Sequence, residues 1–557
     1  MRSRAIPLAL SAALLTACTV TTEDEPEEEA AAAQVEVSAP EEALTVVADE
    51  EAVASAVSTS RALFDSSDVA VLAAEDDRAG MLLGASAAVA LGVPMLVTTG
   101  QEAPEAVGTE LDRLGAETVL AVGEAAGGVP QGGPAVVTVD ADPAAVAEAI
   151  GTDLAESEPV PADGDAAAVA ALDPEEPAAL RPEAASGEAG SEVESEEGTE
   201  EEQEVLPAVD RADPLSDTVL LATGAPGELA GIATARAAGA RVVLTGGATD
   251  PRVPADVVEA LGETDPESVV ALGAGFAAEE GLDWKVATAE TGEQLPGGGQ
   301  TLFPGALLVA LYGHPGTGAL GLMGEQPLEA SIARAKEYAA SYEPLVEDTV
   351  VPTFEIIATV ASASAGDDGD YSAEADPEFL RPWVEAAGEA GMYVVLDLQP
   401  GRESFLSQVE LYRSLLELPH VGLALDPEWR LGPNEVHLRQ IGSVGIEEVN
   451  QVVTWLADLT RENRLPQKLL VLHQFRVDML PGLERLDTSR DELAMMIHVD
   501  GQGGQGAKQA TWRVLHDNAP EGLFWGWKNF IDEDLPMLTP EQTIEQVDPL
   551  PELVTYQ

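Results

Sequence analysis

Cysteine is almost absent from this sequence, because Cys18 is the one cysteine among 557 residues. A single thiol cannot close an intrachain disulfide or build a multi-cysteine zinc site. The fold must therefore be held by packed apolar cores, for which 45% hydrophobic residues are ample. The length allows about three or four domains.

Basic residues are also scarce, since 27 Lys and Arg stand against 100 Asp and Glu and leave a formal net charge of -73. Binding to nucleic acid needs clustered Lys and Arg, so we expect no nucleic-acid partner. An acidic surface is typical of proteins that work in concentrated salt, where screening removes their self-repulsion. Acidic linkers supply part of the charge.

The first residues have the order of an export signal. A charged start with Arg2 and Arg4 precedes an apolar run over 5–15, which is too short to span a bilayer, and Leu-Thr-Ala-Cys18 follows. This order resembles the bacterial lipoprotein lipobox. The resemblance implies that residues 1–17 are a lipoprotein signal peptide and that lipidated Cys18 anchors the chain on the extracellular face of the cell membrane. An ordinary secretory signal with an incidental cysteine is the alternative.

Two acidic stretches, 18–58 and 152–213, contain no aromatic residue. Such segments bury too little surface to offset the entropy of the chain. We therefore predict a disordered stalk over 18–58 and a disordered linker over 152–213.

The segments 59–151 and 214–292 repeat one pattern of strands and helices. Expected strands lie at 68–73, 94–98 and 118–123 in the first segment, and at 217–222, 241–245 and 268–273 in the second. The nearly constant offset indicates an internal duplication. Continuous apolar strands that alternate with helices predict two Rossmann-like parallel α/β modules.

These modules resemble the type 2 cell wall-binding repeat of Gram-positive surface proteins. The resemblance rests on residues 88–98, where a small-residue helix leads into a buried strand, and on residues 110–123. It implies a cell wall polymer as partner. The family's Pro-Asp-Ala-Leu-like loop reads here as residues 76–79 and 225–228. An acidic module needs a divalent bridge or a local basic patch to bind an acidic polymer.

Residues 300–557 have the length and the strand pattern of a (β/α)8-like TIM barrel. Seven apolar strand candidates can be identified, and each ends in polar residues. A TIM barrel has eight strands, so the eighth is hidden or missing. The seven candidates lie at 307–313, 353–360, 393–396, 421–425, 468–472, 495–497 and 523–527. The carboxyl ends of barrel strands converge on one face, which is where such folds place active sites.

Carboxyl groups at these strand ends are the candidate catalytic residues. Extended backbone before Pro427 predicts that Asp426 and Glu428 point the same way, and paired carboxylates raise one pKa and supply a general acid. Residues 421–429 resemble the fourth-strand motif of chitinase-type glycoside hydrolases. That resemblance implies Glu428 as the acid and Asp426 as its partner. Asp397 and Asp500, each of which follows an apolar strand on the same face, are the further candidates.

Other polar and aromatic residues near the strand ends are predicted to bind substrate. His314, His473 and His498 with Asp397 or Asp500 form an alternative metal site, but no paired ligand motif supports it, so we expect no metal and no cofactor. The tryptophans are candidates for stacking on sugar rings, with core packing as the alternative. The predicted substrate-binding residues are Tyr312, His314, Glu355, His473, Gln474, His498, Trp525, Trp527 and Lys528.

Two functions follow from these features. The first is a surface hydrolase of glycosidic bonds in a polysaccharide. The second is a non-catalytic surface protein that binds cell wall polymer or polysaccharide.

We predict that Cys18→Ala releases the protein from membranes without unfolding it, because no disulfide is lost with the thiol. Fractionation of cells that express the variant tests this. A variant that stays with the membrane in the absence of detergent would show that a lipid on Cys18 is not what holds the chain there.

Overall fold

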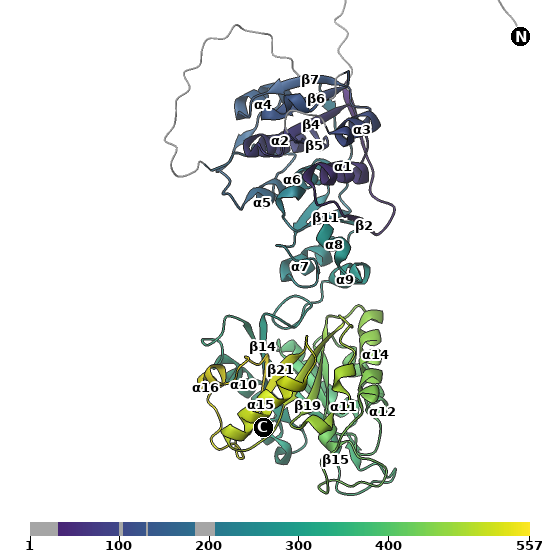
Figure 1. The fold of residues 1–557 in the computed structure, drawn as a ribbon, viewed down its shortest axis with the longest axis vertical. Coiled ribbons are helices and arrows are strands. Elements are labelled where there is room, and N and C mark those ends of the chain that lie inside the picture. Colours follow the sequence, from purple (N-terminus) through teal and green to yellow (C-terminus); the bar gives the residue numbers. More distant parts are fainter. Residues whose placement is uncertain (1–31, 100–103, 130–131, 184–205) are drawn as a thin grey trace, which may run out of the picture.

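The computed structural model describes residues 32–99, 104–129, 132–183 and 206–557. The predicted signal peptide and Cys18 lie outside these residues. Among the described helices, none is both long and apolar enough to cross a membrane. The predicted fold class is confirmed, because mostly parallel α/β sheets precede a closed barrel (Figure 1).

The first module is a parallel sheet with strand order β5-β4-β6-β7. Gly92 ends the helix α2 with a φ of 74°, a left-handed conformation that favours glycine. The strands β4, β5 and β6 are buried or nearly so, which is why they lack a polar alternation, whereas the edge strand β7 is partly exposed. The elements are β4 (Val69–Ala74), α2 (Arg78–Leu91), β5 (Met95–Thr98), α3 (Glu105–Leu114), β6 (Thr118–Val122), β7 (Ala135–Val139) and α4 (Pro143–Ile150).

The second module has the matching order β12-β11-β13-β2. Its edge strand β2 (Leu44–Val47) comes from the beginning of the chain and pairs in parallel with β13. The duplication is therefore completed by a strand that precedes the first module. The other elements are β11 (Thr218–Ala222), α6 (Leu229–Ala237), β12 (Arg241–Leu244), α7 (Ala255–Thr264), β13 (Ser268–Leu272), α8 (Ala274–Ala278) and α9 (Leu282–Ala289).

The two modules share one hydrophobic core. Small residues on α2 and α6, such as Ala85, Ala88, Ala230 and Ala233, are fully or almost fully buried in a single cluster with residues of both sheets. Small side chains let the two helices approach closely. Thr234 also donates a hydrogen bond of 3.2 Å to the backbone of Met95 across the contact. The modules therefore form one folded unit.

The stalk prediction is wrong from residue 33 onward. Residues 33–58 form β1 (Ala33–Val37), β2 and the first part of α1 (Ala52–Leu63). β1 pairs with β3 (Phe64–Ser67) and β10 (Val209–Asp210). Short apolar runs among the acidic residues form these elements. The average composition of the segment does not reveal such short runs.

The linker prediction is wrong over its described parts, 152–183 and 206–213. These parts contain β8 (Ala155–Glu156), α5 (Asp165–Ala170), β9 (Ala178–Ala179) and β10. Val160, Val169, Leu172 and Leu180 are at most 6% exposed and belong to the core shared by the modules. The burial of these few apolar residues against α2 and α6 is therefore enough to hold the segment in place.

The C-terminal domain is a closed barrel of eight parallel strands, as predicted. The hidden eighth strand is β22 (Leu553–Tyr556), which lies between β21 and the first strand β14. β14 also pairs with β15 and closes the barrel. The remaining strands are β14 (Ala306–Gly313), β15 (Thr349–Ala361), β17 (Tyr393–Leu398), β18 (Val421–Leu425), β19 (Lys468–Gln474), β20 (Leu493–Val499) and β21 (Phe524–Asn529).

Helices cover the outside of the barrel. One core cluster joins their apolar faces to alternate strand residues, and a short antiparallel strand, β16 (Ser372–Glu374), extends β15 at one edge. The helices are α10 (Leu328–Ala340), α11 (Pro377–Glu389), α12 (Phe405–Leu411), α13 (Arg413–Leu416), α14 (Ile446–Glu462), α15 (Gln505–Asn518) and α16 (Pro540–Gln546).

The amino ends of the barrel strands face the modules. Gln467, just before β19, bonds to the backbone of Gln300 and Leu302, which lie in the connection to the second module. Asp491, just before β20, pairs with Lys285 of α9 at 2.7 Å and accepts from Arg252 through its backbone oxygen at 3.3 Å. The carboxyl ends of the strands therefore point away from the modules (Figure 1).

We predict that Val554→Asp destabilises the barrel by several kcal/mol, because it places a carboxylate on a fully buried position of the closing strand. Leu550→Asp is the matched control, since Leu550 is 39% exposed just outside β22. Denaturant unfolding of both variants tests the role of β22. Equal stabilities would contradict the closure of the barrel by this strand.

Candidate active site

The interior of the barrel changes from apolar to ionisable along the strands. Near the amino ends, strand residues such as Ala310, Val395, Ala424, Val471 and Met496 form a cluster that contains no helix residue. Alternate residues of a strand share a face. The next inward position on each of these strands is polar: Tyr312, Asp397, Asp426, His473 and His498.

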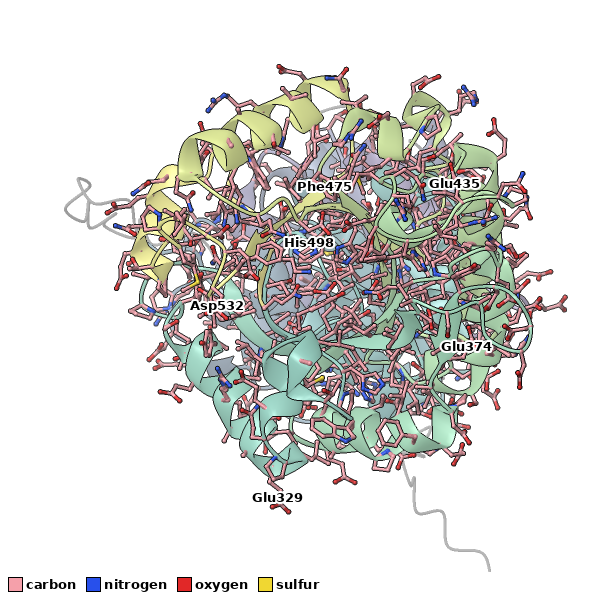
Figure 2. All side chains as sticks on the ribbon, turned by 90° about the horizontal axis from the view of Figure 1, so that it is seen from below. Glu329, Glu374, Glu435, Phe475, His498 and Asp532 are labelled. Carbon is pink, nitrogen blue, oxygen red and sulfur yellow. The ribbon has the colours of Figure 1, made fainter. Side chains whose placement is uncertain are left out.

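A cleft of about 660 Å³ opens at the carboxyl ends of the strands. Figure 2 looks at the molecule from this side, with His498 near the centre and Glu329 and Glu435 toward the outside. Polar lining is contributed by Tyr312, Gln399, Asp426, Glu428, Asp500 and Lys528. Apolar and aromatic lining is contributed by Trp429, Leu438, Ile441, Phe475 and Phe530.

His473 lies between two carboxyl groups beneath the cleft. Its Nδ1 is 2.9 Å from Asp500 Oδ2, and its Nε2 is 2.8 Å from Glu355 Oε1. Burial opposes the charged imidazole, but Glu355 and Asp500 outweigh this effect and raise the pKa of His473 well above its usual value. Burial likewise opposes ionisation of Asp500, and the hydrogen bond from His473 lowers the pKa of this carboxyl overall.

Asp397 and Tyr312 form a second buried pair. The hydroxyl of Tyr312 donates to Asp397 Oδ2 at 2.7 Å, and Gln399 donates to the same hydroxyl at 3.3 Å. Lys528 Nζ lies 3.6 Å from the centre of the Tyr312 ring. Burial and the charge of Glu355 raise the pKa of Asp397 to about 6, although the charge of His473 acts in the opposite direction.

Asp426 and Glu428 both line the cleft, but through a turn rather than an extended strand. Residues Pro427–Trp429 form a 3-10 turn, and Asp426 Oδ1 accepts a hydrogen bond of 3.0 Å from the backbone N–H of Glu428. Burial raises the pKa of Asp426 well above its usual value. Burial and the nearby charge of Asp500 raise the pKa of Glu428 to about 7. The cleft therefore holds two carboxyl groups with a raised pKa, Asp426 and Glu428, and one with a lowered pKa, Asp500.

Of the nine predicted substrate-binding residues, only Tyr312 and Lys528 line the cleft. Glu355, His473 and His498 are buried beneath it, and the other four lie elsewhere. His314 accepts from the backbone N–H of Gly316 and stacks on Phe379. Gln474 donates to the backbone of Arg476 and lines a separate small cavity. The side chains of Trp525 and Trp527 pack with Trp512 in the core beneath the outer helices. Gln474, Trp525 and Trp527 face outward because they alternate with inward positions, whereas His314 lies in the turn after the end of β14. The core-packing alternative holds for both tryptophans.

Several cleft residues were not among the predicted site residues. Gln399 follows Asp397 at a spacing of two, so strand alternation alone places it on the inner face. Phe475 directly follows β19. Trp429, already a candidate for stacking on sugar rings, lies at the end of the 3-10 turn and lines the cleft. Leu438 and Ile441 lie on a long loop, where no periodic pattern signals an inward side chain.

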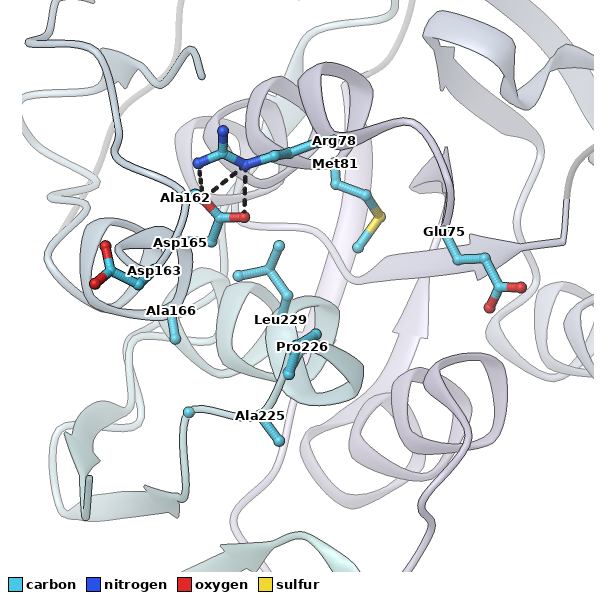
Figure 3. Close-up of a pocket in the computed structure, with 11 residues that line it drawn as sticks. Glu75, Arg78, Met81, Ala162, Asp163, Asp165, Ala166, Ala225, Pro226 and Leu229 are labelled. Atoms are coloured by element: carbon cyan, nitrogen blue, oxygen red, sulfur yellow. Dashed lines mark hydrogen bonds and ion pairs between the residues drawn. The ribbon is translucent and has the colours of Figure 1, made fainter. Parts of the chain in front are cut away.

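The repeat-like loops 76–79 and 225–228 meet at a smaller cavity of about 180 Å³ between the modules (Figure 3). Arg78 there pairs with Asp165 at 2.6 Å and donates to the backbone of Pro161. Glu228 accepts from the backbone N–H groups of Gly224 and Ala225. The arginine in this cavity is thus already neutralised by a residue of the chain itself.

Comparisons with known proteins give partial similarity to solved structures only. No family model matches the chain, and no curated protein matches it. Among solved structures, the chain is similar to Cwp6 from Clostridium difficile, with 12% sequence identity and a TM-score of 0.30. The similarity covers 70% of this chain and 63% of that one, so the chain spans less than two thirds of the length of this neighbour.

Proposed function

We propose that this chain is a cell-surface protein whose barrel hydrolyses glycosidic bonds of a polysaccharide. Glu428 is the general acid, and Asp500 is the second carboxylate. The observation that carries the proposal is the pair of carboxyl groups in one cleft whose surroundings drive their pKa values in opposite directions. Such a pair supplies the proton donor and the anion that glycoside hydrolysis requires.

In the proposed reaction, protonated Glu428 gives its proton to the leaving glycosidic oxygen. Ionised Asp500 stabilises the positive charge that develops on the sugar and acts either on water or on the sugar itself. Buried Asp426 positions Glu428 through the hydrogen bond to its backbone. The aromatic side chains of Trp429, Phe475 and Phe530 offer apolar surface to the faces of sugar rings.

The chemistry next to the cleft favours an anionic polysaccharide. A second hollow of about 450 Å³ shares Glu428 and Trp429 with the cleft and is lined by Arg439 and Arg476. Arg439 is exposed and has no ion-pair partner among the described residues, whereas Arg476 pairs with Asp478 at 2.6 Å. A free guanidinium is notable on a chain with a net charge of -73. It suits the carboxylates or phosphates of wall polymers.

The same proposal includes the placement of the protein at the cell surface. The lipobox-like sequence supports a lipid anchor at Cys18, and the repeat-like sequence of the modules supports contact with cell wall polymer. Because the cleft opens away from the modules, a substrate chain can enter it while the modules are held at the surface. The second candidate function is binding of the polymer without hydrolysis. The observation that favours it is the hollow lined by Arg439 and Arg476.

We predict that Glu428→Gln lowers kcat on the true substrate by about 10²- to 10⁴-fold, because glutamine cannot donate the proton. The assay incubates the full-length chain in detergent with a panel of wall polysaccharides and measures new reducing ends. For the parent protein, kcat should fall as the pH rises above about 7, where Glu428 loses its proton. This fall of kcat with rising pH should be absent in Glu428→Gln.

Glu435→Gln is the matched control, since Glu435 is an exposed residue of the loop beside the cleft. It should leave kcat unchanged. Retained activity in Glu428→Gln would refute the assignment of the acid. Tight binding of a polymer by the parent protein without any cleavage would favour the binding candidate.

A further inference from the structure

We infer that the barrel binds one divalent transition-metal ion of the zinc class beneath the cleft, through Glu355, His473 and His498. Their ligand atoms lie within 4.8 Å of one another, and the three residues come from β15, β19 and β20. All three are 0% exposed. Asp397 on β17, whose Oδ1 lies 3.9 Å from His473 Nε2, is outside this set and would have to move to become a fourth donor. The proposed acid Glu428 does not belong to this site, whereas the proposed second carboxylate, Asp500, contacts it through the hydrogen bond to His473.

The spacing of the donor atoms fits a small tetrahedral ion. Ligands bound to zinc at about 2.1 Å lie about 3.4 Å apart. Glu355 Oε1 is 2.8 Å from His473 Nε2 and 3.8 Å from His498 Nδ1. Asp397 Oδ1 is 3.9 Å from His473 Nε2. The two distances from Glu355 Oε1 lie on either side of the tetrahedral value, and the ligand atoms of Glu355, His473 and His498 all lie within 4.8 Å of one another.

Polar atoms without partners point to a ligand of this kind. Neither ring nitrogen of His498 has a hydrogen-bond partner among the described residues, and the same is true of Asp397 Oδ1. Leaving such a buried group without a partner costs about 1–3 kcal/mol. A metal bond to His498 and Asp397 would remove this cost for one nitrogen and one oxygen.

The opposite atoms of the donor groups are held by hydrogen bonds. Asp500 Oδ2 lies 2.9 Å from His473 Nδ1, so the carboxylate and the imidazole are arranged as in a carboxylate–histidine–metal triad. Thr555 donates to Glu355 Oε2 at 3.0 Å, and Tyr312 donates to Asp397 Oδ2 at 2.7 Å. In each of these three groups, a hydrogen bond holds the atom that faces away from the cluster, and the other atom faces the centre of the cluster.

The donor types select the class of ion. Two imidazole nitrogens with carboxylate oxygens suit Zn²⁺ and its first-row neighbours, whereas Mg²⁺ and Ca²⁺ prefer oxygen donors alone. Without the metal, His473 bridges Glu355 and Asp500 through hydrogen bonds, as in this structure. Metal binding at His473 Nε2 would replace the hydrogen bond to Glu355 and keep Nδ1–H directed at Asp500.

The test measures metal directly on the full-length chain, with Zn²⁺ as the probe. After chelator treatment and dialysis, calorimetric titration with Zn²⁺ should give one site per chain, and X-ray absorption should show imidazole ligands. His498→Gln should abolish this site, and Thr555→Val should weaken it by about 10-fold or more. His314→Gln should bind as the parent does, because His314 lies outside the cluster.

Thermal unfolding of each apo variant shows whether it folds. If His498→Gln does not fold, Thr555→Val and the X-ray absorption of the parent decide the question. Absence of Zn²⁺ binding by the parent, binding that His498→Gln leaves intact, or a bound ion without imidazole ligands would each overturn the inference. No substrate enters these measurements, so they are independent of whether the barrel is a glycoside hydrolase.

Discussion

The hydrogen bonds of His473 to Glu355 and Asp500 are the interaction on which the barrel mouth depends. Five carboxyl groups converge there, those of Glu355, Asp397, Asp426, Glu428 and Asp500, and burial makes each charge costly. One imidazole between two carboxylates lets Glu355 and Asp500 remain ionised. The carboxyl groups without such a partner, those of Asp397, Asp426 and Glu428, have a raised pKa because of burial. The division into acid and anion therefore follows from where His473 lies.

The fold could be predicted where apolar strands are long and repeated. Both modules and seven barrel strands follow from such runs, and the duplication reinforced them. The strand β22 was not predicted because it is only four residues long and follows a proline-containing segment. The elements β2 and α5 were not predicted for a different reason, because their few apolar residues stand among acidic neighbours. Contacts with elements distant in the sequence hold them in place.

The candidate site could be predicted only as far as the ends of strands. Polar residues after apolar runs identified Asp397, Glu428, His473 and Asp500 as cleft or near-cleft residues, but not which neighbours point inward. Strands of a parallel barrel are apolar on both faces, so no polar alternation marks the inner face. His473 and Gln474 are adjacent and equally buried, yet one faces the barrel interior and the other a cavity beneath the helices. That distinction requires the register of the closed barrel.

The most direct test of the central claim is an NMR titration of isotope-labelled glutamate carboxyl groups in the full-length chain. One signal should titrate at a pH of about 7 and should be missing in Glu428→Gln. In Asp500→Asn the same signal should move to lower pH, because the neighbouring negative charge is gone. If every glutamate instead titrates close to the ordinary value of about 4.3, the barrel mouth does not hold Glu428 as an acid.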